Sequence, residues 1–287
     1  MAWQLLEYYS MTDFIDESHY KRFKKLIEEK FGLTLKTLDR EVLSRRFHPR
    51  VLKHNMTGFD EYLDYLVTSP AAAAEWDAIP ALIMNTESYF FREPGQFVVL
   101  ADLLKKQLSA HMPSAIRIIS AGCAAGQEPY SISLLIERDL ALPSGVQIEI
   151  IGMDVNRAAL EKAGFGLYNS YSFRSVPPES LNGHVKRASA NLYKISKSVA
   201  ARVTFSHGNI LDAESFNGLR NAQIIFCRNV LIYMSKRAAA KIVKNLWSAL
   251  DDHGYLFVSQ TESILDHQDL FQPVRRGDVT VYRKKLP

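Results

Sequence analysis

The segment SAGCAAGQEPYS, residues 120–131, holds the residue types most able to form a ligand site. It follows an apolar, β-rich segment and leads into a helix that we expect to begin at Pro129. Small residues between a strand and a helix let the backbone close on a nucleotide or nucleoside. The spacing of Gly122, Ala124 and Gly126 only approximates the glycine fingerprint, so a plain tight turn explains these three residues equally well.

Glu128 decides which ligand this segment favours. A helix N-terminus attracts anions, but a carboxylate at that end repels a pyrophosphate and pairs with an ammonium. The chain also lacks the Gly-Lys-Ser/Thr sequence of a phosphate-binding P-loop. S-adenosylmethionine has a nucleoside, a sulfonium and an amino-acid end, and no phosphate. The segment therefore favours S-adenosylmethionine as cofactor, and we expect no metal.

Polar residues follow three further β-rich segments. Asp154 ends the second segment, where a carboxylate can accept hydrogen bonds from both ribose hydroxyls or cap the following helix. Asn209 follows the third, where an amide can meet an adenine edge. Asn229 and Tyr233 follow the fourth, although an Asn there is often only a turn former. Because open α/β sheets bind ligands at the carboxyl ends of their strands, this repetition favours a ligand site.

The elements that must position these residues alternate between strand and helix after residue 85, which predicts a Rossmann-like α/β fold with a doubly wound, mostly parallel sheet. Two β-rich segments meet around Gly277 and Asp278, so we expect a hairpin and an antiparallel last strand. The polar segment of about 170–202 is too long for an ordinary loop and predicts a small inserted element.

The first 84 residues predict a small all-helical domain. Apolar residues follow helical spacing, with Gly32 where a C-terminal cap would lie: Tyr20, Phe23, Leu26, Ile27 and Phe31. A basic segment without an acid between positions 42 and 59 follows, containing Arg45, Arg46, Arg50 and Lys53. It is either a solvated helix face or a surface that steers an acidic partner. Pro49 within it should kink or end the helix.

Composition limits the remaining classes. The chain has 287 residues, 47% of them hydrophobic, and a net charge of +4. This mild charge of mixed sign does not indicate a nucleic-acid partner. No apolar run is long enough to span a bilayer, and the first residues do not form a signal peptide pattern. Two cysteines, Cys123 and Cys227, predict reduced buried thiols, and we expect a cytoplasmic protein.

Four motifs in this order carry a resemblance to a known family: NTESYFFREPGQF (85–97), SAGCAAGQEPYSIS, GMDVNRAALEKA and IIFCRNVLIYM. Behind a small helical domain, they resemble the CheR family, the protein-glutamate O-methyltransferases of bacterial chemotaxis. The resemblance runs from about residue 15 to the C-terminus. FFRE and CRNVLIYM are specific to this family, whereas the small-residue turn would suit any Rossmann-like methyltransferase.

The resemblance implies methyl transfer from S-adenosylmethionine to glutamate side chains on the acidic cytoplasmic helices of chemoreceptors, with S-adenosylhomocysteine as product. It implies an all-helical domain at 1–84, a methyltransferase domain at 85–287 and a β-subdomain as the inserted element. By motif position it makes Arg92 the essential arginine and places Tyr233 at the reaction site. It implies cofactor contacts for Thr86, Ser88, Arg92, Gly122, Glu128, Asp154, Asn209, Ile210, Asn229 and Val230. The basic segment would bind the receptor, without membrane insertion.

The sequence departs from the family pattern in several places. Thr86 and Ser88 replace the usual Asn and Thr, and both keep a polar group. Gln127 stands where the family commonly has Glu. The inserted element lacks a glycine-rich loop, which argues against docking of a receptor tail peptide.

The chemistry that the resemblance implies needs no general base. A glutamate has an ordinary pKa of about 4.3, so the nucleophile is already ionised at neutral pH. Arg92 can hold the carboxylate of the substrate or of the cofactor, or it can be structural. Tyr233 can lie near the methyl group or simply pack under a helix. Two other functions stay open, a methyltransferase of another acceptor such as RNA or a small molecule, and a non-catalytic module that binds S-adenosylmethionine.

Overall fold

The computed structural model describes residues 14–35, 38–111, 114–181 and 183–286. The expectation about a signal peptide concerns residues 1–13, which lie outside the described residues. The chain divides into two compact units, residues 1–85 with 233–238, and residues 86–232 with 239–287. Within the described part, no helix combines the length and the apolar composition that crossing a membrane requires.

The first unit is built from helices. They are α1 (Glu17–Phe31), α2 (Arg40–Lys53), α3 (Phe59–Thr68), the 3₁₀ turn η3 (Pro70–Ala72), α4 (Ala73–Ala78) and α5 (Pro80–Ile83). Helix α1 ends at Gly32, which has a φ of 73° and donates its N–H to the Glu28 carbonyl. The predicted glycine cap is therefore confirmed. Phe23, Ile27 and Phe31 of α1 are buried, as the helical spacing predicted.

We expected Pro49 to kink or end the helix; it lies inside α2 and does not end it. The helix continues to Lys53. Leu43, Phe47 and Val51 form one buried face that extends past the proline. We conclude that packing of this face outweighs the hydrogen bond that proline removes.

The segment 233–238 packs with the first unit through backbone contacts. Thr34 donates its N–H to the Tyr233 carbonyl at 2.8 Å, and Ser235 donates its N–H to the Gly32 carbonyl at 2.9 Å. Leu33 and Met234 form an isolated antiparallel bridge between these two bonds.

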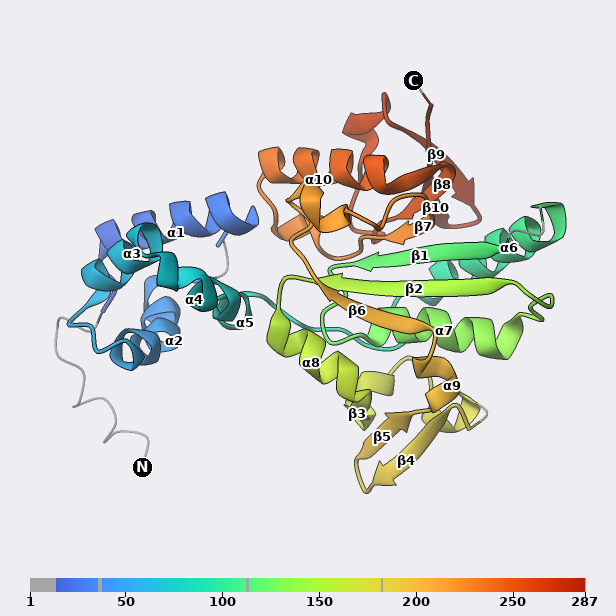
Figure 1. Ribbon diagram of the computed structural model, residues 1–287, viewed down its shortest axis with the longest axis horizontal. Helices are drawn as coiled ribbons and strands as arrows, with labels where there is room; N and C mark the ends of the chain where they lie inside the picture. Colours follow the sequence, from blue (N-terminus) through green and yellow to red (C-terminus); the bar gives the residue numbers. More distant parts are fainter. Residues whose placement is uncertain (1–13, 36–37, 112–113, 182, 287) are drawn as a thin grey trace. The chain divides into compact units, whose positions relative to one another are not determined.

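The second unit contains a seven-stranded sheet with the order β6-β2-β1-β7-β8-β10-β9 (Figure 1). Its strands are β1 (Ala115–Ala121), β2 (Gln147–Asp154), β6 (Val203–His207), β7 (Ala222–Phe226), β8 (Leu250–Phe257), β9 (Phe271–Arg276) and β10 (Val279–Lys284). Strands β6, β2, β1, β7 and β8 are parallel, and β10 pairs antiparallel with both β8 and β9. The predicted Rossmann-like sheet with an antiparallel end is confirmed.

Helices precede and follow the strands of this sheet. Helix α6 (Pro94–His111) comes before β1, and α7 (Gln127–Asp139), α8 (Arg157–Phe165) and α10 (Lys236–Ala249) follow β1, β2 and β7. The 3₁₀ turns η6 (Ala213–Phe216), η7 (Leu231–Tyr233) and η8 (Leu265–His267) follow β6, β7 and β8. Helix α7 begins at Gln127, two residues before the predicted start. In the core, the Phe226 ring stacks on the Phe257 ring with 4.4 Å between centroids.

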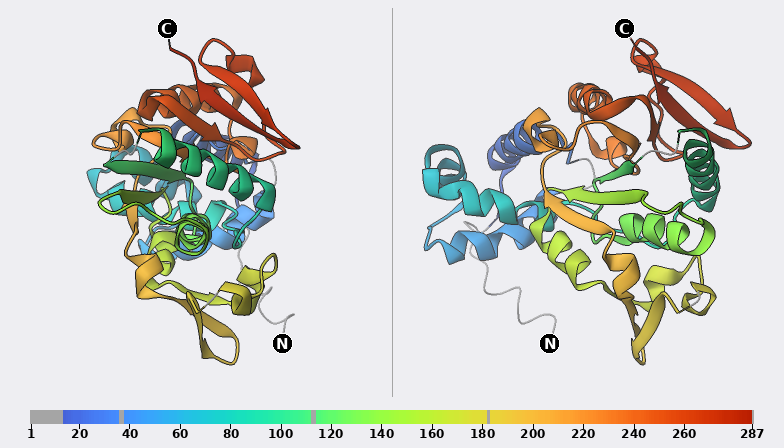
Figure 2. Two further views of the ribbon diagram at one scale, coloured as in Figure 1. Left: turned by 90° about the vertical axis from the view of Figure 1, so that its right-hand side faces the viewer. Right: turned by 45° about the vertical axis from the view of Figure 1, so that its right-hand side comes forward.

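The inserted segment forms a small three-stranded antiparallel sheet with the order β3-β5-β4. Its elements are β3 (Leu167–Asn169), η4 (Ser170–Phe173), η5 (Pro178–Leu181), β4 (Val185–Ser189), β5 (Leu192–Ile195) and α9 (Lys197–Ala200). The Phe173 ring stacks on Phe90 at 4.3 Å, which ties the insertion to the start of the unit. Figure 2 shows the β4–β5 and β9–β10 hairpins at opposite ends of the second unit.

Candidate active site

The turn after β1 is folded back on the end of β2. The N–H groups of Gly122 and Cys123 both donate to the Met153 carbonyl, at 2.8 and 3.0 Å. Gly122 has a φ of 79°, and a Cβ there would lie 2.6 Å from Cγ2 of Val230. Only glycine fits between this turn and the segment after β7. The turn after β1 and the segment after β7 thus lie against each other at the carboxyl edge of the sheet, and we call them the rim.

Asp154 closes the same turn from the end of β2. Its Oδ2 accepts the Ala124 N–H at 2.7 Å, and its Oδ1 accepts the Asn156 N–H at 2.8 Å. Burial raises the pKa of Asp154 above its ordinary value, and these hydrogen bonds oppose that rise. Each oxygen keeps acceptor capacity. The N-cap of α8 is Asn156, whose side chain accepts the Ala159 N–H, so the alternative role of Asp154 as that cap is wrong.

Glu128 is held by two donors from inside the unit. Ser120 donates its hydroxyl to Oε1 at 2.7 Å, and Arg228 donates Nη1 to Oε2 at 2.9 Å. Arg228 also donates Nη2 to the Arg92 carbonyl at 2.5 Å and lies 3.4 Å from Glu93. Burial raises the pKa of Glu128, and the charge of Arg228 only partly offsets that effect. The carboxylate therefore has an arginine partner within the protein.

Glu262 organises the segment after β7. Its Oε1 accepts the N–H groups of Val230 and Ile232 at 2.8 and 3.2 Å. Its Oε2 accepts those of Asn229 and Ser259 at 2.8 and 3.0 Å. Asn229, with a φ of 57°, also donates its side-chain amide to the Ser259 hydroxyl at 2.9 Å. One buried carboxylate thus joins the loops after β7 and β8.

The remaining candidates of the second unit lie after β6 and before α6. The Asn209 Oδ1 accepts the Leu211 N–H at 3.1 Å, and Ile210 is buried. Arg92 is half-buried and donates a long hydrogen bond to the Glu87 carbonyl at 3.4 Å. It forms no ion pair with any described residue. Thr86 is exposed and Ser88 is half-buried.

The other candidates belong to the first unit. Tyr233 lies in the segment that pairs with Leu33 and Thr34. Arg45, Arg46 and Lys53 are exposed on α2.

Arg50 differs from its basic neighbours on α2. It donates Nε to Oε1 of buried Glu75 at 2.7 Å and Nη2 to Oε2. His54 and Tyr62 bind the same carboxylate at 2.8 and 2.6 Å. Arg50 therefore has a structural partner that the sequence did not reveal.

The residues of the second unit fit a nucleoside cofactor without phosphate. The rim offers a buried carboxylate with free acceptor capacity at Asp154, and Gln127 Oε1 is buried without a partner among the described residues. Within those residues, no cluster of His, Cys, Asp or Glu could hold a metal ion. The fold and this donor set define a Rossmann-like enzyme that binds a nucleoside-bearing cofactor at the carboxyl edge of its sheet.

Comparison with known families identifies the chain more closely. The family model described as CheR methyltransferase, SAM binding domain, matches residues 86–279, and the CheR methyltransferase, all-alpha domain, matches residues 18–79. The chain therefore belongs to the CheR methyltransferase family. It is a methyltransferase whose cofactor is S-adenosylmethionine.

Relatives match over most of the chain. Chemotaxis protein methyltransferase 1 of Vibrio cholerae is 30% identical over 277 residues, covering 94% of this chain and 98% of the relative. The chemotaxis protein methyltransferase of Vibrio parahaemolyticus is 29% identical, with the same coverage. A probable biofilm formation methyltransferase, WspC of Pseudomonas aeruginosa, is 31% identical and covers 88% of this chain and 59% of the relative.

Sequence reasoning missed Arg228, Glu93 and Glu262. Arg228 and Glu93 stand inside the CRN and FFRE motifs, where a charge two positions after a phenylalanine was the available signal. Glu262 follows the core strand β8, and a carboxylate just after a buried strand was its only signal.

Proposed function

We propose that this methyltransferase transfers the methyl group of S-adenosylmethionine to glutamate carboxylates of chemoreceptors in the cytoplasm, forming methyl esters for sensory adaptation. The observation that carries the proposal is the match of both CheR family models, together with relatives named chemotaxis protein methyltransferase over 94% of the chain. The proposal extends the family's activity to a particular acceptor, the glutamate side chain.

The cofactor supplies an electrophilic methyl group on a sulfonium, and the protein has to bind it, orient the acceptor and exclude water. We assign Asp154 to the ribose hydroxyls, because its buried oxygens each accept one backbone N–H and can accept more. We assign Asn229 and Val230 to cofactor contact, with Gly122, Asn209 and Ile210 along the same edge of the sheet. Thr86 and Ser88 would contact the cofactor from the segment before Arg92.

The two arginines near α7 support different roles. Arg228 is buried and paired with Glu128 and Glu93, so its charge is used within the protein. Arg92 is half-buried without an ion-pair partner in the described part, so its guanidinium can grip a carboxylate in two-pronged fashion. We assign Arg92 to holding a carboxylate during transfer, and Tyr233 to the place of reaction. Since the acceptor is already ionised at neutral pH, no residue has to remove a proton.

Glu128 has two roles in this proposal, one within the protein and one toward the cofactor. Its oxygens accept hydrogen bonds from Ser120 and Arg228, which fix the start of α7. The side chain is 15% exposed, which leaves one edge available to the amino group of the cofactor.

The exposed bases of α2 support recognition of an acidic partner. Arg45, Arg46 and Lys53 are solvent-facing, whereas Arg50 is held by Glu75. A receptor helix dense in glutamate would be attracted by these charges, and its binding should weaken as salt screens them.

A labelled-methyl assay tests the proposal. The chain is incubated with methyl-labelled S-adenosylmethionine and membranes that contain chemoreceptors of the same organism. We expect label on the receptor that is released as methanol by mild alkali, as a carboxyl methyl ester requires. Alkali-stable label, or transfer to a non-receptor acceptor only, would contradict the proposal. Label confined to a receptor outside chemotaxis would favour a role like that named for the Pseudomonas aeruginosa relative.

A further inference from the structure

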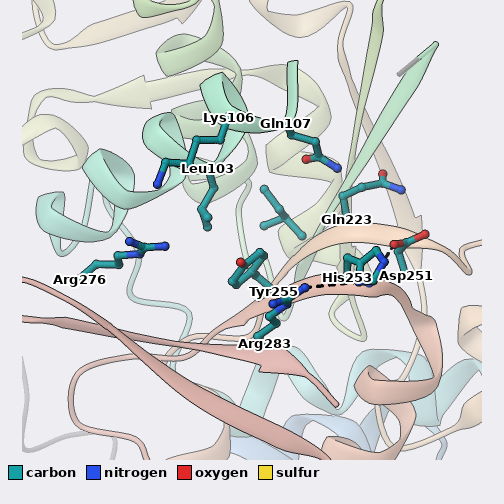
Figure 3. A pocket seen from close by; sticks show the side chains of 10 residues that line it. Leu103, Lys106, Gln107, Gln223, Asp251, His253, Tyr255, Arg276 and Arg283 are labelled. Carbon is teal, nitrogen blue, oxygen red and sulfur yellow. Dashed lines mark hydrogen bonds between the residues drawn. The ribbon is translucent and has the colours of Figure 1, made fainter. Parts of the chain in front are cut away.

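A cavity of about 510 Å³ lies in the second unit, away from the candidate active site (Figure 3). It is bordered by α6, by β7 and β8, and by the β9–β10 hairpin. Gln223 lines it from the amino end of β7, whereas Arg228 and Asn229 follow the carboxyl end of that strand. The cavity and the cofactor rim are therefore at opposite edges of the sheet.

Cations line this cavity without carboxylate partners. Lys106, Arg276 and Arg283 have exposed side chains and form no ion pair within the described part of the chain. Arg283 has a polar contact from Nη2 to Nδ1 of His253, at 3.4 Å. Asp251 is the one carboxylate of the lining, and its Oδ1 accepts the backbone N–H of His253 at 3.0 Å. Three unpaired cations around a hollow favour an anionic ligand.

The middle of the cavity is apolar. Leu103 and Ile224 are buried, and Tyr255, which lines the same cavity, is the partner of Ile224 in the sheet. Tyr255 is opposite Arg283 in the sheet and next to Ile224, so its position is fixed by two strands. An aromatic and aliphatic surface of this kind binds the face of a planar ring.

The polar groups are distributed unevenly about Tyr255. Figure 3 shows Lys106 and Arg276 on one side of the ring and Gln107 with Asp251 on the other. Gln223 uses its amide for the Arg117 N–H and the Asn221 carbonyl. The Gln107 side chain and the second oxygen of Asp251 form no hydrogen bond with a described residue and can meet the edge of a heterocycle.

We propose that this cavity binds a nucleotide. The phosphate lies against Lys106 and Arg276, the base lies over Leu103 and Tyr255, and Asp251 accepts hydrogen bonds from the base edge. Guanine offers adjacent N–H donors for a carboxylate, so guanosine 5′-monophosphate is the probe of choice. The cavity volume lies within the range of small-molecule sites.

Calorimetric titration of guanosine 5′-monophosphate into the full chain tests this site. Saturating S-adenosylhomocysteine is present throughout, so that the adenosine part of the cofactor site is blocked. We expect binding that is at least tenfold tighter than that of guanosine or of inorganic phosphate. Phosphate binding as tight as the nucleotide would overturn the proposal, and so would no nucleotide binding at millimolar concentration.

Matched variants locate the binding. Lys106→Glu and Arg276→Glu should weaken nucleotide binding at least tenfold. Lys105→Glu and Arg275→Glu make the same charge change one residue away, on side chains outside the cavity lining, and should leave it unchanged. Equal weakening in both sets would overturn the site. Titration of S-adenosylhomocysteine confirms that each variant is folded.

Discussion

Arg228 and Glu128, separated by 100 residues in the chain, form a buried ion pair with 2.9 Å between Nη1 and Oε2. Arg228→Met should destabilise the chain by about 3–5 kcal/mol, because Glu128 would then be buried without a charged partner. In a Glu128→Gln background, the same substitution should cost much less. Urea unfolding of the wild type, both single variants and the double variant measures the coupling. If Arg228→Met lowers the free energy of unfolding equally in both backgrounds, the Arg228–Glu128 pair contributes nothing to stability.

Arg92→Ala should lower methyl transfer by on the order of a hundredfold or more, because the guanidinium no longer holds a carboxylate in place. The free energy of unfolding should change little, since Arg92 forms no ion pair with a described residue. Calorimetric titration of S-adenosylmethionine then shows whether Arg92 holds the carboxylate of the substrate or that of the cofactor. Unchanged cofactor affinity assigns Arg92 to the substrate, and weakened affinity assigns it to the cofactor. Full turnover in this variant would remove Arg92 from the mechanism.

Arg174→Ala is the matched control for this experiment. The guanidinium carbon of Arg174 lies 3.7 Å from the Tyr89 ring centroid, and that of Arg92 lies 5.5 Å from the same centroid. Arg174 also forms an ion pair with Glu87. Removing this arginine should affect stability rather than the rate of transfer.

Glu262→Gln should weaken S-adenosylmethionine binding by on the order of tenfold. The side-chain NH2 of the introduced glutamine would face backbone N–H groups that the Glu262 carboxylate accepts in the wild type. Each buried donor left without an acceptor costs about 1–3 kcal/mol of stability. Hydrogen exchange should quicken at Asn229 and Val230 and stay slow in β1. The exposed Glu161→Gln on α8 is the control. Unchanged exchange at 229–232 in Glu262→Gln would contradict the positioning role.

Asp154→Ala and Asn156→Ala separate cofactor binding from helix capping. Asp154 caps the turn at Ala124, whereas Asn156 caps α8 at Ala159. We expect Asp154→Ala to abolish binding of S-adenosylmethionine. Asn156→Ala should lower the free energy of unfolding by about 1 kcal/mol and keep binding. Titration calorimetry and urea unfolding measure both effects, and equal loss of binding in the two variants would refute the separation.

The alignment of the polar strand ends was predictable from the sequence. Parallel strands place their carboxyl ends at one edge, so Asp154, Asn209 and Asn229 had to lie along the same side of the sheet. These residues lie at or just after the carboxyl ends of β2, β6 and β7, and these strands are neighbours in the order β6-β2-β1-β7. The pattern of apolar residues in each strand and the turn residues after it are enough to predict where each strand ends.

The partners of the charged residues were not predictable in the same way. Glu128 reads as a charge at a helix start, but its ion pair with Arg228 depends on the packing of β1 beside β7. Arg50 reads as one of four bases, but Glu75 reaches it only when α2 and α4 fold together. Pairings at long sequence separation depend on tertiary geometry, which residue types alone do not encode.

Glu75 should make the first unit sensitive to acid. Burial alone would raise the pKa of Glu75, but hydrogen bonds from Arg50, Tyr62 and His54 outweigh burial and lower it from 4.5 to about 2. A carboxyl whose pKa is lower in the folded state stabilises the fold above its unfolded pKa. That stabilisation, about 3 kcal/mol, is therefore lost as pH falls from about 4.5 to about 2.

Urea unfolding is monitored by circular dichroism at pH 7, 4 and 3. As pH falls, the free energy of unfolding of the wild type should approach that of Glu75→Gln. The exposed Glu29→Gln is the control and should follow the wild type throughout, since Glu29 is 61% exposed in a long 3.9 Å contact with Lys25. A constant difference between wild type and Glu75→Gln across this range would show that the cluster does not titrate with folding.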